Sequence, residues 1–294
     1  MKQNGDSPMI GDKSPGSVDF WCDAWQQVRQ SSLLKTTQKA NPEKWLDFYD
    51  RVSDIWLEMW GNPWVLGRAV GHALCQKGDL DQNTRVLDVG SGPGALAVPL
   101  AGLAKQVTAL DNSRGMLRTA QVNAKKHGLS NLETWWGDWR DYKPLDLYGL
   151  VIAGFFPPAM GPDGLGSLES LSKGAVALVI GTGSETVPWR RELWSRIMDK
   201  PLEFSNLHLT CALNYLLTSG RMPDLRHFSL PVELDLDKDR VLKYFSSYFK
   251  IFGKSGLEVD RILQDWAAPK TTDGRIKSRG RVEAALLVWQ KPGA

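Results

Sequence analysis

A glycine-rich turn in the first half of the chain is the residue pattern best suited to hold a ligand. Its sequence is Val86-Leu87-Asp88-Val89-Gly90-Ser91-Gly92-Pro93-Gly94, so glycines stand at alternate positions after a short apolar run. Glycine lets the backbone turn tightly and come close to a bound molecule. If a helix follows, the free N–H groups of its first turn face the same molecule. The spacing differs from the Gly-x-Gly-x-x-Gly pattern of dinucleotide sites, because residue 95 is Ala.

An acidic residue at the end of the next apolar run supplies a second binding group. Asp111 follows the run 106–110. A carboxylate in this position can accept hydrogen bonds from two ribose hydroxyls. Taken alone, Asp111 is better interpreted as an exposed loop residue. Beside the glycine turn, ribose binding is the favoured interpretation.

The elements that must position these residues alternate along the chain. Short apolar runs predict buried strands, and the segments between them have helical spacing. Strands are expected at about 85–89, 106–111, 131–136, 147–153 and 175–181, with helices at about 95–104 and 113–127. This alternation predicts parallel βαβ units, and therefore an α/β fold with a doubly wound sheet and helices on both faces.

The segments on either side of this core differ from it in residue pattern. Before it, aromatic residues recur at helical spacing, and Asn41-Pro42 interrupts and restarts the helical pattern. The expected division is a flexible tail at 1–17, a helical N-terminal cap at 18–76, a core at 77–186, a substrate-side insertion at 187–279 and a final strand at 280–294.

Motifs in the core resemble those of class I methyltransferases that use S-adenosylmethionine (SAM). The glycine turn resembles their motif I, Asp111-Asn112-Ser113 with Met116-Leu117 their second motif, and Gly137-Asp138-Trp139 their third. The resemblance covers about 84–182 and the last strand, Arg281–Gln290. It implies a Rossmann-like sheet of seven strands with a reversed C-terminal strand, SAM as cofactor and S-adenosylhomocysteine (SAH) as product. The flanks more loosely resemble small-molecule methyltransferases of the ubiquinone-biosynthesis-like type, in which such segments cap the substrate.

The resemblance also implies roles for individual residues. Asp88 would organise the glycine loop and the methionine end, and Asp111 would hold the ribose. Asp138 would contact the adenine amino group, with the backbone of Trp139 facing the ring. The full set expected to bind the cofactor is Asp88, Gly90, Ser91, Gly92, Gly94, Asp111, Asn112, Met116, Gly137, Asp138, Trp139 and Ala153.

The segment after the fourth expected strand bears on the acceptor. Enzymes that methylate amines of bases or amides often resemble Asn/Asp-Pro-Pro-aromatic here, whereas this chain reads Phe156-Pro157-Pro158-Ala159. The departure weakens that interpretation, and the prolines either shape the pocket or merely stiffen a loop. No catalytic base is assigned, because methyl transfer needs one only when the acceptor carries a proton. For Tyr215, His227 and Asp163 a structural role is favoured.

Composition limits the function classes further. The net charge is +3 and the basic clusters are modest, so a nucleic-acid partner is not favoured. The cysteines are far apart and the histidines lack metal-ligand spacing, so we expect free thiols, no metal and a cytoplasmic location. No apolar stretch is long enough to span a bilayer, and no signal peptide is expected.

The sequence therefore predicts methyl transfer from SAM to a small, apolar or aromatic acceptor. Tryptophans such as Trp56, Trp60 and Trp64 could form an aromatic lid, although core packing is the favoured role for such a stripe. The alternatives are an RNA or protein methyltransferase, an inactive methyltransferase fold acting as a binding or regulatory subunit, and a nicotinamide-dependent oxidoreductase. Whether the chain forms a homodimer is left open.

Overall fold

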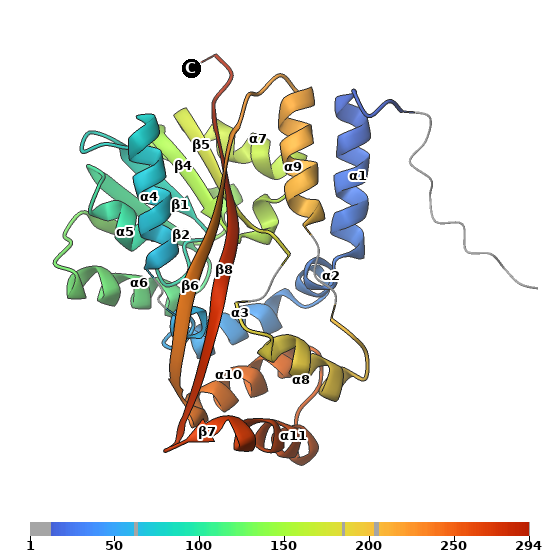
Figure 1. Ribbon diagram of the computed structural model, residues 1–294. Coiled ribbons are helices and arrows are strands. Elements are labelled where there is room, and N and C mark those ends of the chain that lie inside the picture. Colours follow the sequence, from blue (N-terminus) through green and yellow to red (C-terminus); the bar gives the residue numbers. More distant parts are fainter. Residues whose placement is uncertain (1–12, 62–63, 184–185, 203–205, 294) are drawn as a thin grey trace, which may run out of the picture.

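One mixed sheet runs through the molecule (Figure 1). The computed structural model describes residues 13–61, 64–183, 186–202 and 206–293. The strands follow the order β3-β2-β1-β4-β5-β8-β6, and the short β7 pairs with β8. Their bounds are β1 (Arg85–Val89), β2 (Gln106–Asp111), β3 (Leu132–Trp136), β4 (Tyr148–Gly154), β5 (Ser172–Gly181), β6 (Asp224–Asp237), β7 (Thr271–Thr272) and β8 (Arg275–Gln290).

The direction of the strands confirms the predicted fold class. Strands β1 to β5 pair in parallel, whereas β8 is antiparallel to both β5 and β6. The main path holds seven strands with a reversed C-terminal one, and β7 adds an eighth. The strand order changes direction between β1 and β4, which is where open α/β sheets bind ligands beyond the carboxyl ends of their strands.

The strand β6 corrects the predicted insertion at 187–279. It lies inside that segment but pairs with β8 along its whole length, so it belongs to the core sheet. Its second half alternates between buried apolar and exposed polar residues, as in Val232-Glu233-Leu234-Asp235, which is the period of a half-buried strand. The C-terminal strand also begins earlier than predicted, at Arg275, because β6 offers it a partner there.

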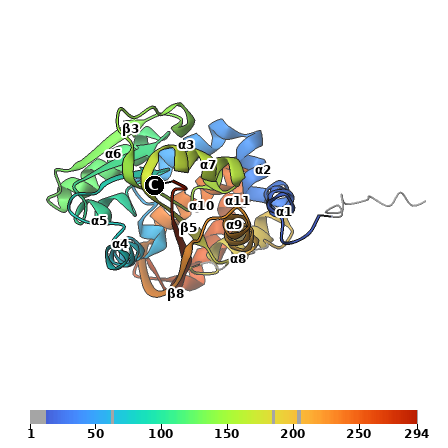
Figure 2. The same cartoon turned by 90° about the horizontal axis from the view of Figure 1, so that it is seen from above.

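Helices cover both faces of the sheet and one end of it (Figures 1 and 2). One face packs against α4, α5 and α6, and the other against α1, α7 and α9. A third core joins α3, α8, α10 and α11 to the far halves of β6 and β8. The bounds are α1 (Val18–Ser31), α2 (Leu33–Ala40), α3 (Pro42–Val52), α4 (Val65–Lys77), α5 (Ala97–Ala101), α6 (Arg114–Lys126), α7 (Pro162–Ser170), α8 (Trp189–Met198), α9 (Leu207–Thr218), α10 (Lys238–Ile251) and α11 (Leu257–Ala267).

The segment predicted as an N-terminal cap is distributed over all three cores. Trp25 of α1 is buried on one face of the sheet, and α4 packs on the other. The part from α2 to the short helix η1 (Glu58–Trp60) and the first turn of α4 reach the cavity described below. Most of the predicted tail, residues 1–12, lies outside the described residues. In the described part of the chain, no helix is both long and apolar enough to cross a membrane.

Candidate functional site

The glycine turn after β1 has the conformation that its sequence predicts. Gly90, Gly92 and Gly94 have φ angles of +69°, +53° and +92°, which side chains rarely tolerate. A Cβ on Gly90 would lie 2.2 Å from the ring of Phe156, whereas one on Gly92 would meet nothing within 4 Å. Gly90 therefore lets Phe156 pack against the turn, and Gly92 leaves space beside the backbone.

Asp111 is hydrogen-bonded both to this turn and to the start of α6. Its Oδ2 accepts a hydrogen bond from the Gly92 N–H at 2.9 Å, and its Oδ1 accepts one from the Ser113 N–H at 2.8 Å. Burial raises the pKa of Asp111, while these N–H groups favour its charged form. Each carboxylate oxygen has a second lone pair, so the residue can still accept hydrogen bonds from a ligand.

Asp88 and Ser91 present buried oxygens beside the same turn. The pKa of Asp88 is raised to about 7, because burial and the nearby Asp111 raise it more than the hydrogen bond from the Ala97 N–H lowers it. Within the described residues, neither Asp88 Oδ2 nor Ser91 Oγ has a hydrogen-bond partner. Buried polar atoms without partners are costly and rare in proteins. Their place beside an open turn fits a ligand that brings a hydrogen-bond donor.

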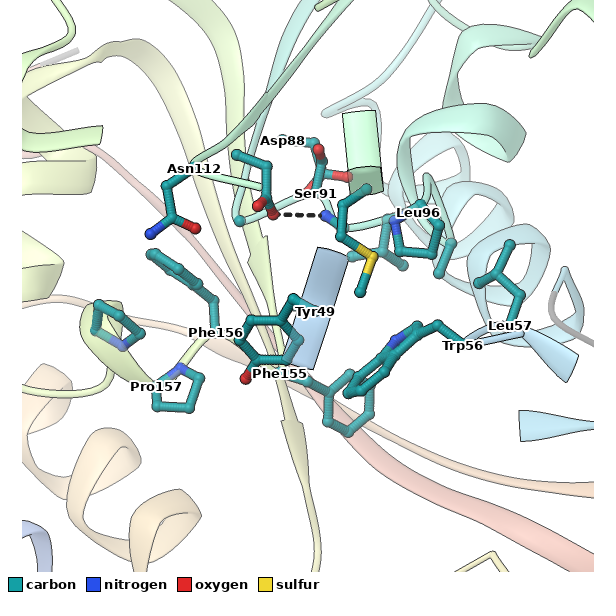
Figure 3. Close-up of a pocket in the computed structure, with 18 of the residues that line it drawn as sticks. Tyr49, Trp56, Leu57, Asp88, Ser91, Leu96, Asn112, Phe155, Phe156 and Pro157 are labelled. Carbon is teal, nitrogen blue, oxygen red and sulfur yellow. Dashed lines mark hydrogen bonds between the residues drawn. The ribbon is translucent and has the colours of Figure 1, made fainter. Parts of the chain in front are cut away.

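These residues border a cavity of about 350 Å³ (Figure 3). Figure 3 shows Asp88 and Ser91 at one end, with Tyr49, Trp56 and Phe155 at the other. The core supplies the glycine turn, the end of β2 and the segment after β4, and α2, α3 and the following turn supply the opposite wall. The lining includes Gln38, Trp45, Tyr49, Trp56, Trp60, Asp88, Gly90, Ser91, Gly92, Asp111, Asn112, Met116, Arg140, Phe155, Phe156, Pro157 and Pro158.

The structure brings most of the predicted cofactor residues to this cavity and leaves others outside its lining. Those that line it are Asp88, Gly90, Ser91, Gly92, Asp111, Asn112 and Met116. Gly94, Gly137, Asp138, Trp139 and Ala153 are absent from the lining.

The predicted adenine-side residues are engaged within the protein. The carboxylate of Asp138 accepts hydrogen bonds from the backbone N–H and the guanidinium of Arg140. Trp139 is buried, with its ring 5.8 Å from that of Phe156. Arg140 reaches the cavity in place of Asp138. Sequence reasoning missed Arg140 because the motif points to Gly137, Asp138 and Trp139.

The proline-rich segment after β4 takes part in the cavity wall. Phe156, Pro157 and Pro158 line it, which favours the pocket-shaping interpretation over a simple stiff loop. By contrast, Tyr215, His227 and Asp163 do not line it. Within the described ranges, no three His, Cys, Asp or Glu side chains gather closely enough to hold a metal ion.

The helix α3 is fastened over the cavity by Asp50, a residue that sequence reasoning did not single out. Asp50 Oδ1 accepts hydrogen bonds from Ser113 Oγ at 2.6 Å and from the Gly115 N–H at 2.8 Å. A Cβ on Gly115 would lie 3.0 Å from backbone atoms of Asp50, so glycine permits this close approach. The same helix carries Trp45 and Tyr49 to the cavity.

Replacing Asp50 with alanine is expected to lower the free energy of unfolding by about 1–3 kcal/mol, because it leaves hydrogen-bond donors of the α6 first turn without their partner. Urea unfolding at neutral pH measures this loss. Asp47→Ala is the matched control, since Asp47 lies on the same helix and pairs with the exposed Arg51. We expect that control to change stability by at most about 0.5 kcal/mol. Equal losses in the two variants would contradict the fastening role.

Comparisons with known proteins agree with this geometry. Residues 80–153 match a family model described as a methyltransferase domain. Release factor glutamine methyltransferase from Coxiella burnetii is 34% identical over 74 residues, which are 24% of this chain and 27% of that relative. The 23S rRNA (uracil(1939)-C(5))-methyltransferase of Edwardsiella ictaluri is 42% identical over 72 residues, which are 24% of this chain and 16% of that relative. The chain therefore covers about a quarter or less of the length of these relatives.

One of the solved structures found in the comparison is a SAM-dependent methyltransferase from Geobacter sulfurreducens in complex with SAH. It covers 78% of this chain and 92% of its own, with 17% identity and a TM-score of 0.47. The matched family model spans the glycine turn and Asp111, and the sheet has the reversed C-terminal strand that the resemblance implied. Residues 80–153 are therefore similar to a methyltransferase domain.

Proposed function

We propose that the protein transfers a methyl group from SAM to a small, apolar or aromatic acceptor. One observation carries this proposal: the glycine turn after β1, the buried Asp88, and Asp111 meet at a single cavity, where Asp88 Oδ2 and Ser91 Oγ have no hydrogen-bond partner among the described residues. The cavity lies beyond the carboxyl ends of β1 and β4, at the switch point of the sheet, where such folds bind ligands.

The residues of the cavity fit the parts of SAM. Asp88 Oδ2 and Ser91 Oγ are placed to accept hydrogen bonds from the ammonium group of its methionine end. Asp111 would accept from the ribose hydroxyls, and Asn112 and Met116 would border the adenine. The contact of Asp138 with adenine stays a prediction, since Arg140 binds that carboxylate.

Methyl transfer from SAM depends more on the positioning of the two reactants than on acid–base catalysis. When bound, SAM supplies a methyl group on a positively charged sulfur, and an acceptor lone pair displaces that sulfur to leave neutral SAH. The aromatic rings of Tyr49, Trp56 and Trp60 on the cavity wall favour a positive charge and exclude water. Holding the two reactants in line can supply much of the rate enhancement.

The small acceptor is favoured over RNA or protein by the form of the site. The relatives whose names mention rRNA or a release factor align with at most about a third of this chain, so their acceptors do not transfer to it. Here the cavity is closed on one side by α3, and the walls are mainly apolar. We also propose a cytoplasmic location, with which the three free cysteines agree.

Calorimetric titration of SAH into the purified chain tests the cofactor proposal. We expect saturable binding of one SAH per chain with a dissociation constant in the micromolar range, and no comparable heat from NAD. The absence of binding from a folded sample would overturn the proposed function. If RNA binds instead, with an affinity that falls steeply with salt, the RNA methyltransferase alternative is supported.

A further inference from the structure

A second cavity adjoins the first on the side away from the glycine turn. Its volume is about 360 Å³, within the range of small-molecule sites. It is bordered by the ends of β5 and β8 and by α3, α8 and α10. The residues that line both cavities are Trp45, Tyr49, Trp56, Trp60, Phe155, Pro157 and Val282. The two spaces therefore share one aromatic partition.

The wall of the second cavity is rich in aromatic rings from different helices. Besides the shared partition, it includes Phe48 of α3, Trp189 of α8, and Tyr244, Phe245 and Tyr248 of α10. Several of these rings pack against each other in edge-to-face pairs, such as Phe48 and Tyr244, whose centroids are 5.6 Å apart. Pairs of this kind leave ring faces and edges that suit another flat ring.

The charged and titratable side chains on this wall argue against a cationic ligand. Among the described residues they are Arg190, His208 and Glu283, besides the tyrosines. The carboxylate of Glu283 is already engaged by Ser229 and by His227. His208 Nδ1 accepts a hydrogen bond from the Trp25 indole at 3.2 Å, which is the neutral form of the imidazole with its proton on Nε2. Arg190 brings a positively charged side chain to this wall.

The partition between the cavities contains a strained residue. Phe155 directly follows β4 and has φ +49°, a left-handed conformation that is rare for a bulky side chain and costs about 1–3 kcal/mol. Its ring centroid lies 5.0 Å from that of Trp60, and both residues line both cavities. The next residue, Phe156, faces only the first cavity. The strained turn thus directs the rings of Phe155 and Phe156 differently, so that Phe155 lines both cavities and Phe156 lines the first.

We propose that the second cavity binds the methyl acceptor, and that this acceptor is a planar aromatic molecule without a positive charge. Phe155 and Trp60, which line both cavities, then flank the place where its reacting atom meets the methyl group. The proposal rests on the proposed function, because it takes the first cavity as the SAM site. It adds the place and the chemical class of the acceptor.

Three probes with one carbon skeleton separate the chemical classes. Titrations into the protein saturated with SAH would use 2-naphthol, decahydro-2-naphthol and the trimethyl(2-naphthyl)ammonium ion. We expect saturable binding of 2-naphthol, with an affinity about tenfold above that of the saturated alcohol, since ring packing contributes beyond burial. We expect the cation to bind more weakly than 2-naphthol. Similar affinities for the two alcohols, tighter binding of the cation, or no binding of 2-naphthol would overturn the proposal.

A variant and a matched control assign the binding to this cavity. Tyr244 lines only the second cavity, so Tyr244→Leu is expected to weaken 2-naphthol binding about tenfold and to leave SAH binding unchanged. Phe252 belongs to the same aromatic cluster, with its ring 5.3 Å from that of Tyr248, but it lines neither cavity. Phe252→Leu is therefore expected to leave the affinity for 2-naphthol unchanged. Equal weakening in both variants would overturn the location.

The SAH titration keeps the two proposals distinct. If SAH fails to bind the wild-type protein, the proposed function itself falls. If SAH binds and 2-naphthol does not, only the acceptor proposal falls.

Discussion

The Asp111→Ala variant is expected to bind SAH at least about a hundredfold more weakly than the wild-type protein. In the proposed complex, the carboxylate accepts hydrogen bonds from both ribose hydroxyls, and a hydrogen bond to a charged group contributes about 1.5–3 kcal/mol. Asp111 also orders the turn through the N–H groups of Gly92 and Ser113, so its loss disturbs the cavity wall as well. Calorimetric titration at neutral pH measures the change.

Two controls separate this effect from charge loss and from unfolding. Asp146 is an exposed carboxylate in the loop before β4, 3.7 Å from Arg85, so Asp146→Ala removes the same charge away from the cavity. We expect wild-type affinity from that variant. Urea unfolding of Asp111→Ala must show a cooperative transition. A folded Asp111→Ala protein with wild-type affinity would contradict the assigned role.

The Asp88→Asn variant is expected to be more stable than the wild-type protein at alkaline pH. Burial raises the pKa of Asp88 from 3.8 to about 7, so the folded state binds its proton more tightly than the unfolded state does. The stability that this proton contributes is fully present below about pH 4 and is lost as the pH rises through about 7. Asparagine does not ionise, so the variant avoids this loss, which amounts to at most about 4 kcal/mol. Urea unfolding at several pH values between 4.5 and 8 measures the difference, which should grow with pH.

The same variant is expected to bind SAH more weakly at pH 8. A charged Asp88 can pair with the ammonium group of the ligand, and asparagine cannot. For the wild-type protein, ligand affinity should rise with pH up to about 7 and then level off, as Asp88 loses its proton. The variant should lack this rise. A stability difference that does not change with pH, or an unchanged pH profile of binding, would contradict the role of Asp88.

If Asp88→Asn gains stability and loses affinity for SAH, the result would identify Asp88 as a functional residue. Asp88 is buried without a full set of partners, which costs the free protein stability. Such a cost persists where a ligand uses the group. Asp50 is the opposite case, since its hydrogen bonds are made within the protein and its loss is expected to destabilise it.

The features that could be predicted from the sequence depend on neighbours along the chain. The glycine turn, the strand before it and Asp111 at the end of the next strand are local patterns with periodicities of their own. Parallel strands then bring their carboxyl ends to one edge of the sheet, so Asp88 and Asp111 had to lie near each other. The twofold alternation in β6 is also local, but its pairing with β8 joins separate parts of the chain, so the sequence alone places this segment in the expected insertion.

The sequence by itself thus determined the α/β sheet and one wall of the proposed cofactor cavity, while the tertiary structure decided the rest. The second cavity exists because α3, α8 and α10 pack beside the ends of β5 and β8, and no periodicity specifies those contacts. Asp50 meets Ser113 across more than sixty residues of chain. Arg140 reaches the cavity because Asp138 orients it. Each of these depends on packing between distant segments, whose geometry a residue pattern does not encode locally.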